Sequence, residues 1–277
     1  MKLRLVRHLW GVDISRGLSP YIAPWRENGY ELLEVSLRRL PDPAIFLKIL
    51  QNEGFAWIPQ VFSNMFAGGG SVQQHLLSLR EQVEECLDAS PLFINAHSGS
   101  DAWTTAEAED FYGLVTEMEG ELGVNISHET HRSRYFGNPW NTKHILDRFP
   151  HLQLTCDFSH WVCVAERLLQ DCTEILNQVA DHCLHIHARV GYEEGPQVPD
   201  PRAPEWAEHL RVHETWWEMV WSAQRKRSFQ TSTLTPEFGP PLYMQIMPYT
   251  QKPLANLTEI CDWMALRQAN RFRAMNA

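Results

Sequence analysis

Four segments of this chain end in side chains that can bind a metal ion. Glu129 closes the run GVNISHE, Asp157 closes LQLTCD, His187 lies within CLHIHARV, and Glu237 follows TSTLTP. In such runs apolar and polar residues alternate with a period of two, which is typical of a β-strand with two different faces. A carboxylate at the end of a buried strand is unfavourable unless it is paired or bound to a cation. The four strand ends therefore predict chemistry that depends on a cation.

The residue types indicate which cation. Three carboxylates at one point repel and neutralise one another unless a positive charge lies between them. Three carboxylate oxygens and one imidazole suit Mn²⁺, Mg²⁺ or Co²⁺ better than a metal that prefers thiolates, and Zn²⁺ is also compatible. A single Asp at a strand end is more often a turn former or a helix cap, and a single His is more often an interior residue. The prediction of one divalent ion depends on all four acting together: Glu129, Asp157, His187 and Glu237.

These side chains can meet only if their strands lie side by side. Eight predicted strands alternate with helical segments, which implies a parallel sheet with helical crossovers. Eight such units in roughly 250 residues fit a closed (β/α)8 TIM barrel, and an open doubly wound sheet is the alternative. We expect one α/β domain over residues 1–277. The predicted strands cover 3–9, 30–37, 54–62, 91–97, 123–129, 152–157, 183–190 and 231–238.

Helix signals separate the strands. Asp42 precedes a proline, Ser71 precedes an apolar periodic run, and Thr104 and Glu107 have the spacing of a capping box. No GxGxxG or GxxxxGK[ST] motif follows a predicted strand, so dinucleotide and P-loop sites lack support. The predicted helices cover 20–28, 42–51, 71–87, 104–121, 139–149, 164–182, 204–227 and 254–277.

In a TIM barrel the active site lies at the C-terminal ends of the strands. Polar residues two positions apart share one strand face, so Asn95 lies with His97 and His185 with His187. Glu34 ends the second strand, where we expect it to pair with Arg7 or to anchor a loop rather than to bind the ion.

At these residues the chain resembles the xylose-isomerase-like barrel superfamily, especially the sugar phosphate isomerases and epimerases that include the ketose 3-epimerases. That family holds one divalent metal with Glu, Asp, His and Glu from the last four strands. Glu129 in SHETH, Asp157 in CDFSH, His187 in HIHAR and Glu237 in TPEFG match in order. His160, three residues after Asp157, matches a family histidine that contacts substrate oxygens.

The resemblance implies an isomerase or epimerase that acts on a small sugar, sugar phosphate or related keto-polyol by proton transfer through an enediolate. Glu129 and Glu237 are then the catalytic acid and base as well as metal ligands. The expected substrate-binding residues are His160, Arg189, His97, His185, His131 and Arg132. The loop 191–206 follows the seventh strand and lies over the predicted site.

Two alternatives remain open at this stage. The endonuclease IV relatives of the same barrel hydrolyse phosphodiesters with several metals and extra histidines, and the chain offers His97, His128, His131, His182, His185 and His213. A net charge of -10 opposes DNA binding, which needs a basic face. A non-catalytic sugar-binding barrel is the second alternative.

Composition narrows the partners and the compartment. No signal peptide and no run of about eighteen apolar residues is present, so we expect no membrane partner. Six cysteines without a CxxC pair favour reduced thiols and a cytoplasmic protein. We expect a small polyhydroxylated substrate and no nucleic acid, and a homo-oligomer is compatible with the sequence.

Overall fold

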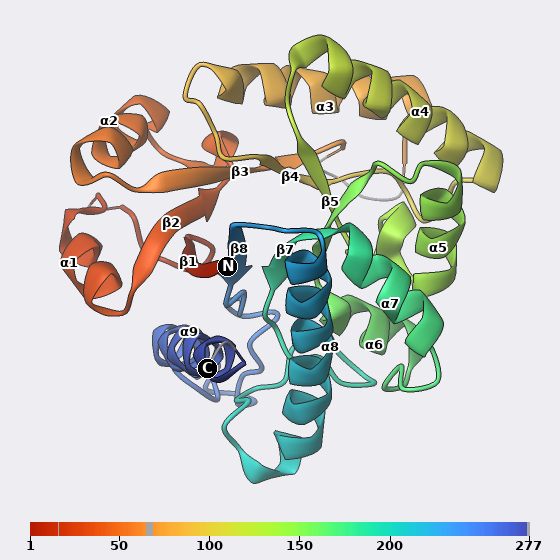
Figure 1. The fold of residues 1–277 in the computed structure, drawn as a ribbon. Coiled ribbons are helices and arrows are strands. Elements are labelled where there is room, and N and C mark those ends of the chain that lie inside the picture. Colours follow the sequence, from red (N-terminus) through yellow and green to blue (C-terminus); the bar gives the residue numbers. More distant parts are fainter. Residues whose placement is uncertain (16, 65–68, 276–277) are drawn as a thin grey trace.

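The protein is a closed barrel of eight parallel strands, as the sequence predicts. A computed structural model describes residues 1–15, 17–64 and 69–275. The strands follow one another in chain order, and β8 pairs with β1 to close the barrel (Figure 1). The open-sheet alternative is therefore wrong. The strands are β1 Lys2–His8, β2 Tyr30–Val35, β3 Ala56–Phe62, β4 Ile94–His97, β5 Ile126–Glu129, β6 Gln153–Cys156, β7 Cys183–His187 and β8 Thr231–Thr235.

Helices surround the barrel and begin where the sequence signals predict. Ser71 and Thr104 each form a capping box, and the Asp42 side chain accepts a hydrogen bond from the Ile45 backbone N–H. The α-helices are α1 Ser19–Glu27, α2 Pro43–Glu53, α3 Val72–Leu87, α4 Thr105–Leu122, α5 Pro139–Arg148, α6 Phe158–Ala165, α7 Thr173–His182, α8 Ala207–Lys226 and α9 Leu257–Ala274. Three short 3-10 helices cover Leu37–Arg39, Tyr135–Gly137 and Pro204–Trp206.

The predicted helix over 164–182 is wrong. The chain forms α6 directly after Asp157, whose side chain caps that helix by accepting from the Ser159 N–H at 3.0 Å. Glu166 adopts a left-handed conformation with φ of 51°, which ends α6. The apolar residues from Leu168 onward form a buried turn, and α7 starts only at Thr173. Because Asp157 is not recognised as a helix cap from the sequence, the predicted helix begins at residue 164 instead of 158.

Two apolar clusters hold the barrel together. The larger one fills the layer between the strands and the helices, and a small one lies within the barrel, formed by Val6, Leu32, Ile58 and Phe93. Along β5, Ser127 and Glu129 face the interior, while His128 points outward and bonds the Ser98 hydroxyl at 2.7 Å. The period of two therefore places the predicted ligands on the interior face.

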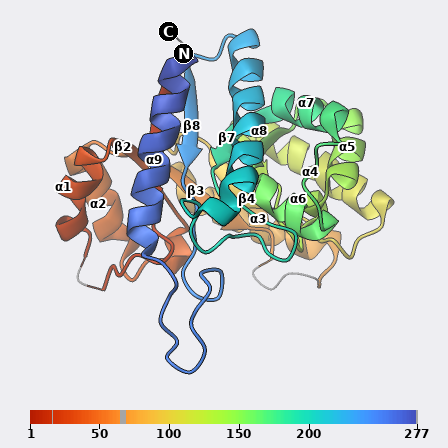
Figure 2. The ribbon, with the colours of Figure 1, turned by 90° about the horizontal axis from the view of Figure 1, so that it is seen from below.

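A loop arm extends from the C-terminal end of the barrel. Residues 240–254 project away from the end at which both termini lie (Figure 2). Ile246 and Pro253 form an antiparallel bridge within this arm, and Leu242 and Tyr249 near it are exposed. The root of the arm carries Tyr243 back toward the strand ends, so the arm contributes to the site described below.

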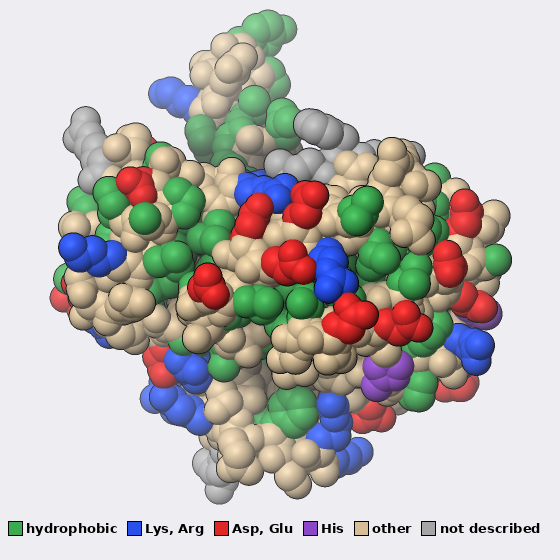
Figure 3. Space-filling model, turned by 90° about the horizontal axis from the view of Figure 1, so that it is seen from above, with side chains coloured by type: hydrophobic (Ala, Val, Ile, Leu, Met, Phe, Trp, Pro, Cys, Tyr) green, Lys and Arg blue, Asp and Glu red, His purple; other side chains and the backbone are tan. Residues whose placement is uncertain are grey.

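The outer surface and the cysteines add two observations. Acidic side chains gather over α3 and α4 with few basic ones between them (Figure 3), including the exposed Glu81, Glu84 and Glu117. All six cysteines are free thiols. Among the described residues, no helix combines the length and the apolar character needed to cross a bilayer.

Glu119 on α4 makes a pH-dependent link to β5. Its carboxylate accepts a hydrogen bond from the Ile126 N–H at 2.7 Å, and burial raises the pKa of Glu119 to about 7. Because the folded pKa lies above the unfolded one, this group stabilises the fold less as the pH rises from about 4.5 to about 7.

We expect Glu119→Gln to retain the hydrogen bond and to lose this pH dependence. The difference in unfolding free energy, variant minus native chain, should be about 1 kcal/mol more favourable to the variant at pH 8 than at pH 4.5. Urea denaturation at both pH values measures this difference. An equal difference at the two pH values would contradict it.

Candidate metal centre

The barrel brings the four predicted ligands to one point. Glu129, Asp157, His187 and Glu237 each offer a ligand atom, and these atoms lie within 4.8 Å of one another. Glu129 ends β5, Asp157 and Glu237 follow β6 and β8, and His187 ends β7. All four side chains are buried, so their charges are poorly screened by solvent.

Three atoms of this set have no hydrogen-bond partner. They are Glu129 Oε1, His187 Nδ1 and Glu237 Oε2. His187 Nδ1 lies 2.9 Å from Glu237 Oε2 and 3.6 Å from a Glu129 oxygen, yet neither pair satisfies these atoms with a well-aligned hydrogen bond. Buried polar atoms without partners are rare in folded proteins. The donor set therefore fits a divalent cation that would bind these three atoms together with Asp157.

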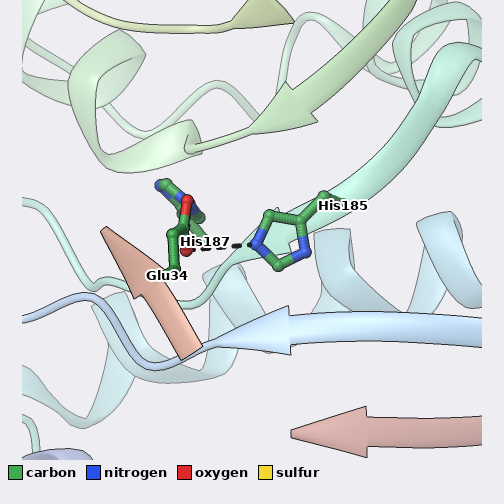
Figure 4. A group of neighbouring side chains, drawn as sticks. All are labelled: Glu34, His185 and His187. Carbon is green, nitrogen blue, oxygen red and sulfur yellow. Dashed lines mark hydrogen bonds and ion pairs between the residues drawn. The ribbon is translucent and has the colours of Figure 1, made fainter. Parts of the chain in front are cut away.

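Glu34 orients the histidine. Its carboxylate lies 3.0 Å from His187 Nε2 and 3.5 Å from His185 Nε2 (Figure 4). It also accepts hydrogen bonds from Asn95 at 2.8 Å and Thr235 at 2.6 Å. A carboxylate at Nε2 leaves Nδ1 facing the other ligands. The expectation that Glu34 supports the site rather than binding the ion agrees with this position, but Glu34 bonds His187 instead of Arg7 or a loop.

Opposite charges within the cluster shift the pKa values of its side chains. Burial lowers the pKa of His187, but the carboxylates of Glu237, Glu34 and Glu129 outweigh it and raise that pKa well above its ordinary value. Burial raises the pKa of Glu237, but His187 and Arg189 lower it to about 2. Glu237 is therefore ionised, as a carboxylate ligand must be, whereas burial raises the pKa of Asp157 to about 6.

Arg189 and His160 lie beside Asp157. The Arg189 guanidinium donates to the Asp157 carboxylate and lies 3.3 Å from Glu237 Oε2. The same guanidinium lies 2.7 Å from His160 Nε2, and burial lowers the pKa of His160 well below its ordinary value. His160 is thus a neutral imidazole, and its Nδ1 has no hydrogen-bond partner.

A cavity of about 240 Å³ opens above these ligands. His97 lies in its wall, 2.8 Å from Glu129, and the His131 ring lies between those of His97 and His160, with centroids 4.6 and 4.0 Å away. Arg132 lies with its guanidinium 5.0 Å from the centre of the Tyr243 ring.

His185 lies deeper in the barrel. Its two ring nitrogens bond Thr233 at 2.8 Å and Thr235 at 3.0 Å, and within the described chain it is not among the cavity-lining residues. The structure thus brings His97, His131 and Arg189 to the cavity and His160 beside Asp157, and places His185 beneath His187. Arg132 contacts Tyr243 and is not among the cavity-lining residues of the described chain.

Several cavity residues were not predicted as site residues. His8 ends β1 and lies 3.5 Å from Glu237, and its position at a strand end was the available signal. The others occupy β3 or loops, where period-two alternation offers no signal for a site. They are Arg39, Gln60, Phe62, Ser133, Arg134 and Tyr243, and Trp10 after the end of β1 also lines the cavity.

No protein-family model and no curated protein sequence matches this chain. Solved structures do match. A D-allulose 3-epimerase from Methylomonas sp. covers 98% of this chain and 98% of its own, with 14% identity and a TM-score of 0.63. A xylose isomerase-like TIM barrel protein from Mycobacterium smegmatis in complex with magnesium covers 96% and 95%, with 12% identity and a TM-score of 0.62.

This chain shares the closed (β/α)8 TIM barrel fold with these proteins. The fold also includes other reaction classes, since an AP endonuclease of family 2 from Brucella melitensis covers 95% of this chain and 98% of its own, with 12% identity and a TM-score of 0.62. The reaction must therefore be argued from the residues of the site.

We expect Glu34→Gln to weaken Mn²⁺ binding about 10–100-fold, because an amide no longer holds the His187 ring as a carboxylate does. Isothermal titration calorimetry of the metal-free protein measures this affinity. Glu31→Gln is the matched control, since Glu31 lies on the same strand and pairs outside the barrel with Lys2 at 2.7 Å. Equal affinities for the two variants would refute the orienting role of Glu34.

Proposed function

We propose that this protein is a divalent-metal-dependent isomerase or epimerase that moves a proton next to the carbonyl of a small polyhydroxylated substrate. The observation that supports this most is the position of Glu129 and Glu237. Their unpartnered oxygens belong to one ligand cluster, and Glu237 also lines the cavity. Two ionised carboxylates beside one bound substrate supply the acid and the base that such a reaction needs.

The chain's own residues divide the work. One of Glu129 and Glu237 removes the proton from the carbon beside the carbonyl, and the other returns it. A divalent ion, when bound, would polarise the substrate's carbonyl and adjacent hydroxyl and stabilise the enediolate charge. Mn²⁺, Mg²⁺ or Co²⁺ suits the oxygen-rich donor set, and Zn²⁺ is compatible with it.

Neighbouring side chains position the substrate in this proposal. Arg189 donates to substrate oxygens, and His160 offers an uncharged imidazole beside it. His97 and His131 contact a further hydroxyl from the cavity wall. His185 acts from below by fixing Thr235, which bonds Glu34.

The nuclease alternative gains one observation and loses others. Two further groups of three possible ligands lie within 4.8 Å among the described residues: His97, Glu129 and His131, and Glu34, His185 and His187. His128, however, faces away from the barrel, His182 bonds the Leu152 carbonyl, and His213 bonds the His209 carbonyl. The acidic surface over α3 and α4 is also unsuited to a DNA backbone (Figure 3).

We expect hydrogen–deuterium exchange to reveal the reaction. Incubation with a panel of ketoses, ketose phosphates and keto-acids in D₂O with Mn²⁺ should place deuterium on the carbon beside a carbonyl, measured by NMR. Glu237→Gln should slow this exchange about 10²–10⁴-fold, because the base is lost. Glu259→Gln on the exposed start of α9 should leave it unchanged. The absence of exchange across the whole panel with metal-loaded protein would count against the proposal.

We also expect one tightly bound Mn²⁺ per chain. Elemental analysis after gel filtration counts the metal, and Asp157→Asn should reduce it to near zero while circular dichroism stays native. Two or three tightly bound ions, together with cleavage of DNA that contains an abasic site, would favour the nuclease instead. If the native protein shows no turnover and the Glu129→Gln variant still binds a sugar, the non-catalytic binding barrel would be favoured.

A further inference from the structure

One wall of the cavity carries arginines with no carboxylate partner. The ligand cluster forms the acidic end of the cavity, and Arg39 and Arg134 line it elsewhere. Arg39 lies in the 3-10 turn after β2, and Arg134 lies in the loop after β5. Among the described residues, neither forms an ion pair with Asp or Glu within 4.0 Å. The cavity lining therefore combines acidic and unpaired basic side chains.

Arg39 differs sharply from its neighbour in sequence. Arg38 pairs on the surface with Glu85 at 2.6 Å and Glu81 at 3.8 Å. Arg39 turns to the cavity instead, and its guanidinium lies 4.9 Å from the centre of the Phe62 ring. The aromatic face orients the guanidinium without neutralising it, so its donors remain available to a ligand.

Arg134 is a buried cation, with only 3% of its surface exposed. It donates to the backbone carbonyls of Asn64 at 2.8 Å and Gly99 at 3.4 Å, and its Nε has no hydrogen-bond partner. These carbonyls hold the two loops in place but carry no net charge. A buried guanidinium without a counter-ion is unfavourable, so an anionic ligand would stabilise this arrangement.

Arg132 is a third cation, and it contacts Tyr243, which lines the cavity. Its guanidinium lies over the Tyr243 ring, and in the described part of the chain it has no carboxylate partner within 4.0 Å. Among the described residues, two guanidiniums without a carboxylate partner thus line one small cavity, and a third packs against its lining residue Tyr243, in a chain whose net charge is -10. The outer face over α3 and α4, by contrast, carries more acidic than basic side chains (Figure 3). This distribution favours a small anion over a polyanion.

We propose that the substrate carries an anionic group, a phosphate or a carboxylate, and that Arg39 and Arg134 bind it while Arg132 adds favourable charge. This inference rests on the proposed function for the other end of the substrate, whose carbonyl and hydroxyl face Glu129 and Glu237. A guanidinium offers paired donors that match the oxygens of either anion. Neutral sugars of the same length then bind more weakly.

The first experiment tests anion binding without turnover. Inorganic phosphate and acetate are titrated separately into Mg²⁺-loaded protein by isothermal titration calorimetry. Arg39→Met should raise the dissociation constant of the preferred anion about tenfold or more, because a charge-assisted contact is lost. Arg38→Met removes an adjacent surface arginine and should have no effect. The anion that binds more tightly indicates whether phosphate or carboxylate is the natural group.

Arg134 requires a milder change because it also holds two loops. Arg134→Lys keeps the charge and should retain part of the anion affinity, whereas Arg134→Met should lose it, and circular dichroism reports whether each variant folds. The proposal is overturned if neither anion binds, or if Arg38→Met and Arg39→Met reduce binding equally.

A second experiment separates this inference from the proposed reaction. Deuterium exchange is compared for a neutral ketose and its phosphate or carboxylate analogue. Arg39→Met should raise the KM of the anionic substrate about tenfold and leave the KM of the neutral one unchanged. Exchange at equal KM with both substrates would retain the proposed reaction and overturn the anion site. Anion binding that depends on Arg39, without any exchange, would retain the anion site and overturn the reaction.

Discussion

The convergence of three buried carboxylates is the constraint on which the rest of this structure depends. Glu129, Asp157 and Glu237 meet where solvent cannot screen them, so the fold must supply positive charge at the same place. Arg189 forms ion pairs with Asp157 and Glu237, and His187 forms one with Glu237. Among the described residues, Glu129 Oε1, His187 Nδ1 and Glu237 Oε2 still have no hydrogen-bond partner. A network that served only to pair charges would not leave these atoms unbonded.

The barrel makes this convergence possible. Parallel strands present their C-terminal ends at one rim, and four consecutive strands bring residues that are distant in sequence to one point. Glu34 reaches the same point from β2, on the other side of the interior, and fixes the histidine ring. Asp157 serves twice, since one oxygen caps α6 and the other faces Arg189. The position of α6 and the geometry of the cluster are therefore coupled through one side chain.

Above the cluster, loops decide what the site can accept. Tyr243 comes from the root of the arm, and its ring lies 5.0 Å from the guanidiniums of both Arg132 and Arg189. Trp10 packs against the same ring at 4.8 Å and lies so close to Gly239 that a side chain there would clash. The strand ends thus carry the candidate ligands, whereas the loops and turns shape the cavity and contribute Arg39 and Arg134 to its lining.

The sequence by itself determined the barrel and the convergence of four candidate ligand side chains, because period-two alternation and strand ends are local signals that the chain repeats. It did not locate the end of α6, since Glu166 stops the helix by its backbone conformation, which no residue pattern marks. Only the tertiary structure decided that Glu34 orients His187, that His185 lies beneath it, and that Arg39 and Arg134 share a cavity. These relations join strands and loops far apart in the chain. They depend on barrel closure and loop packing, which local alternation does not encode.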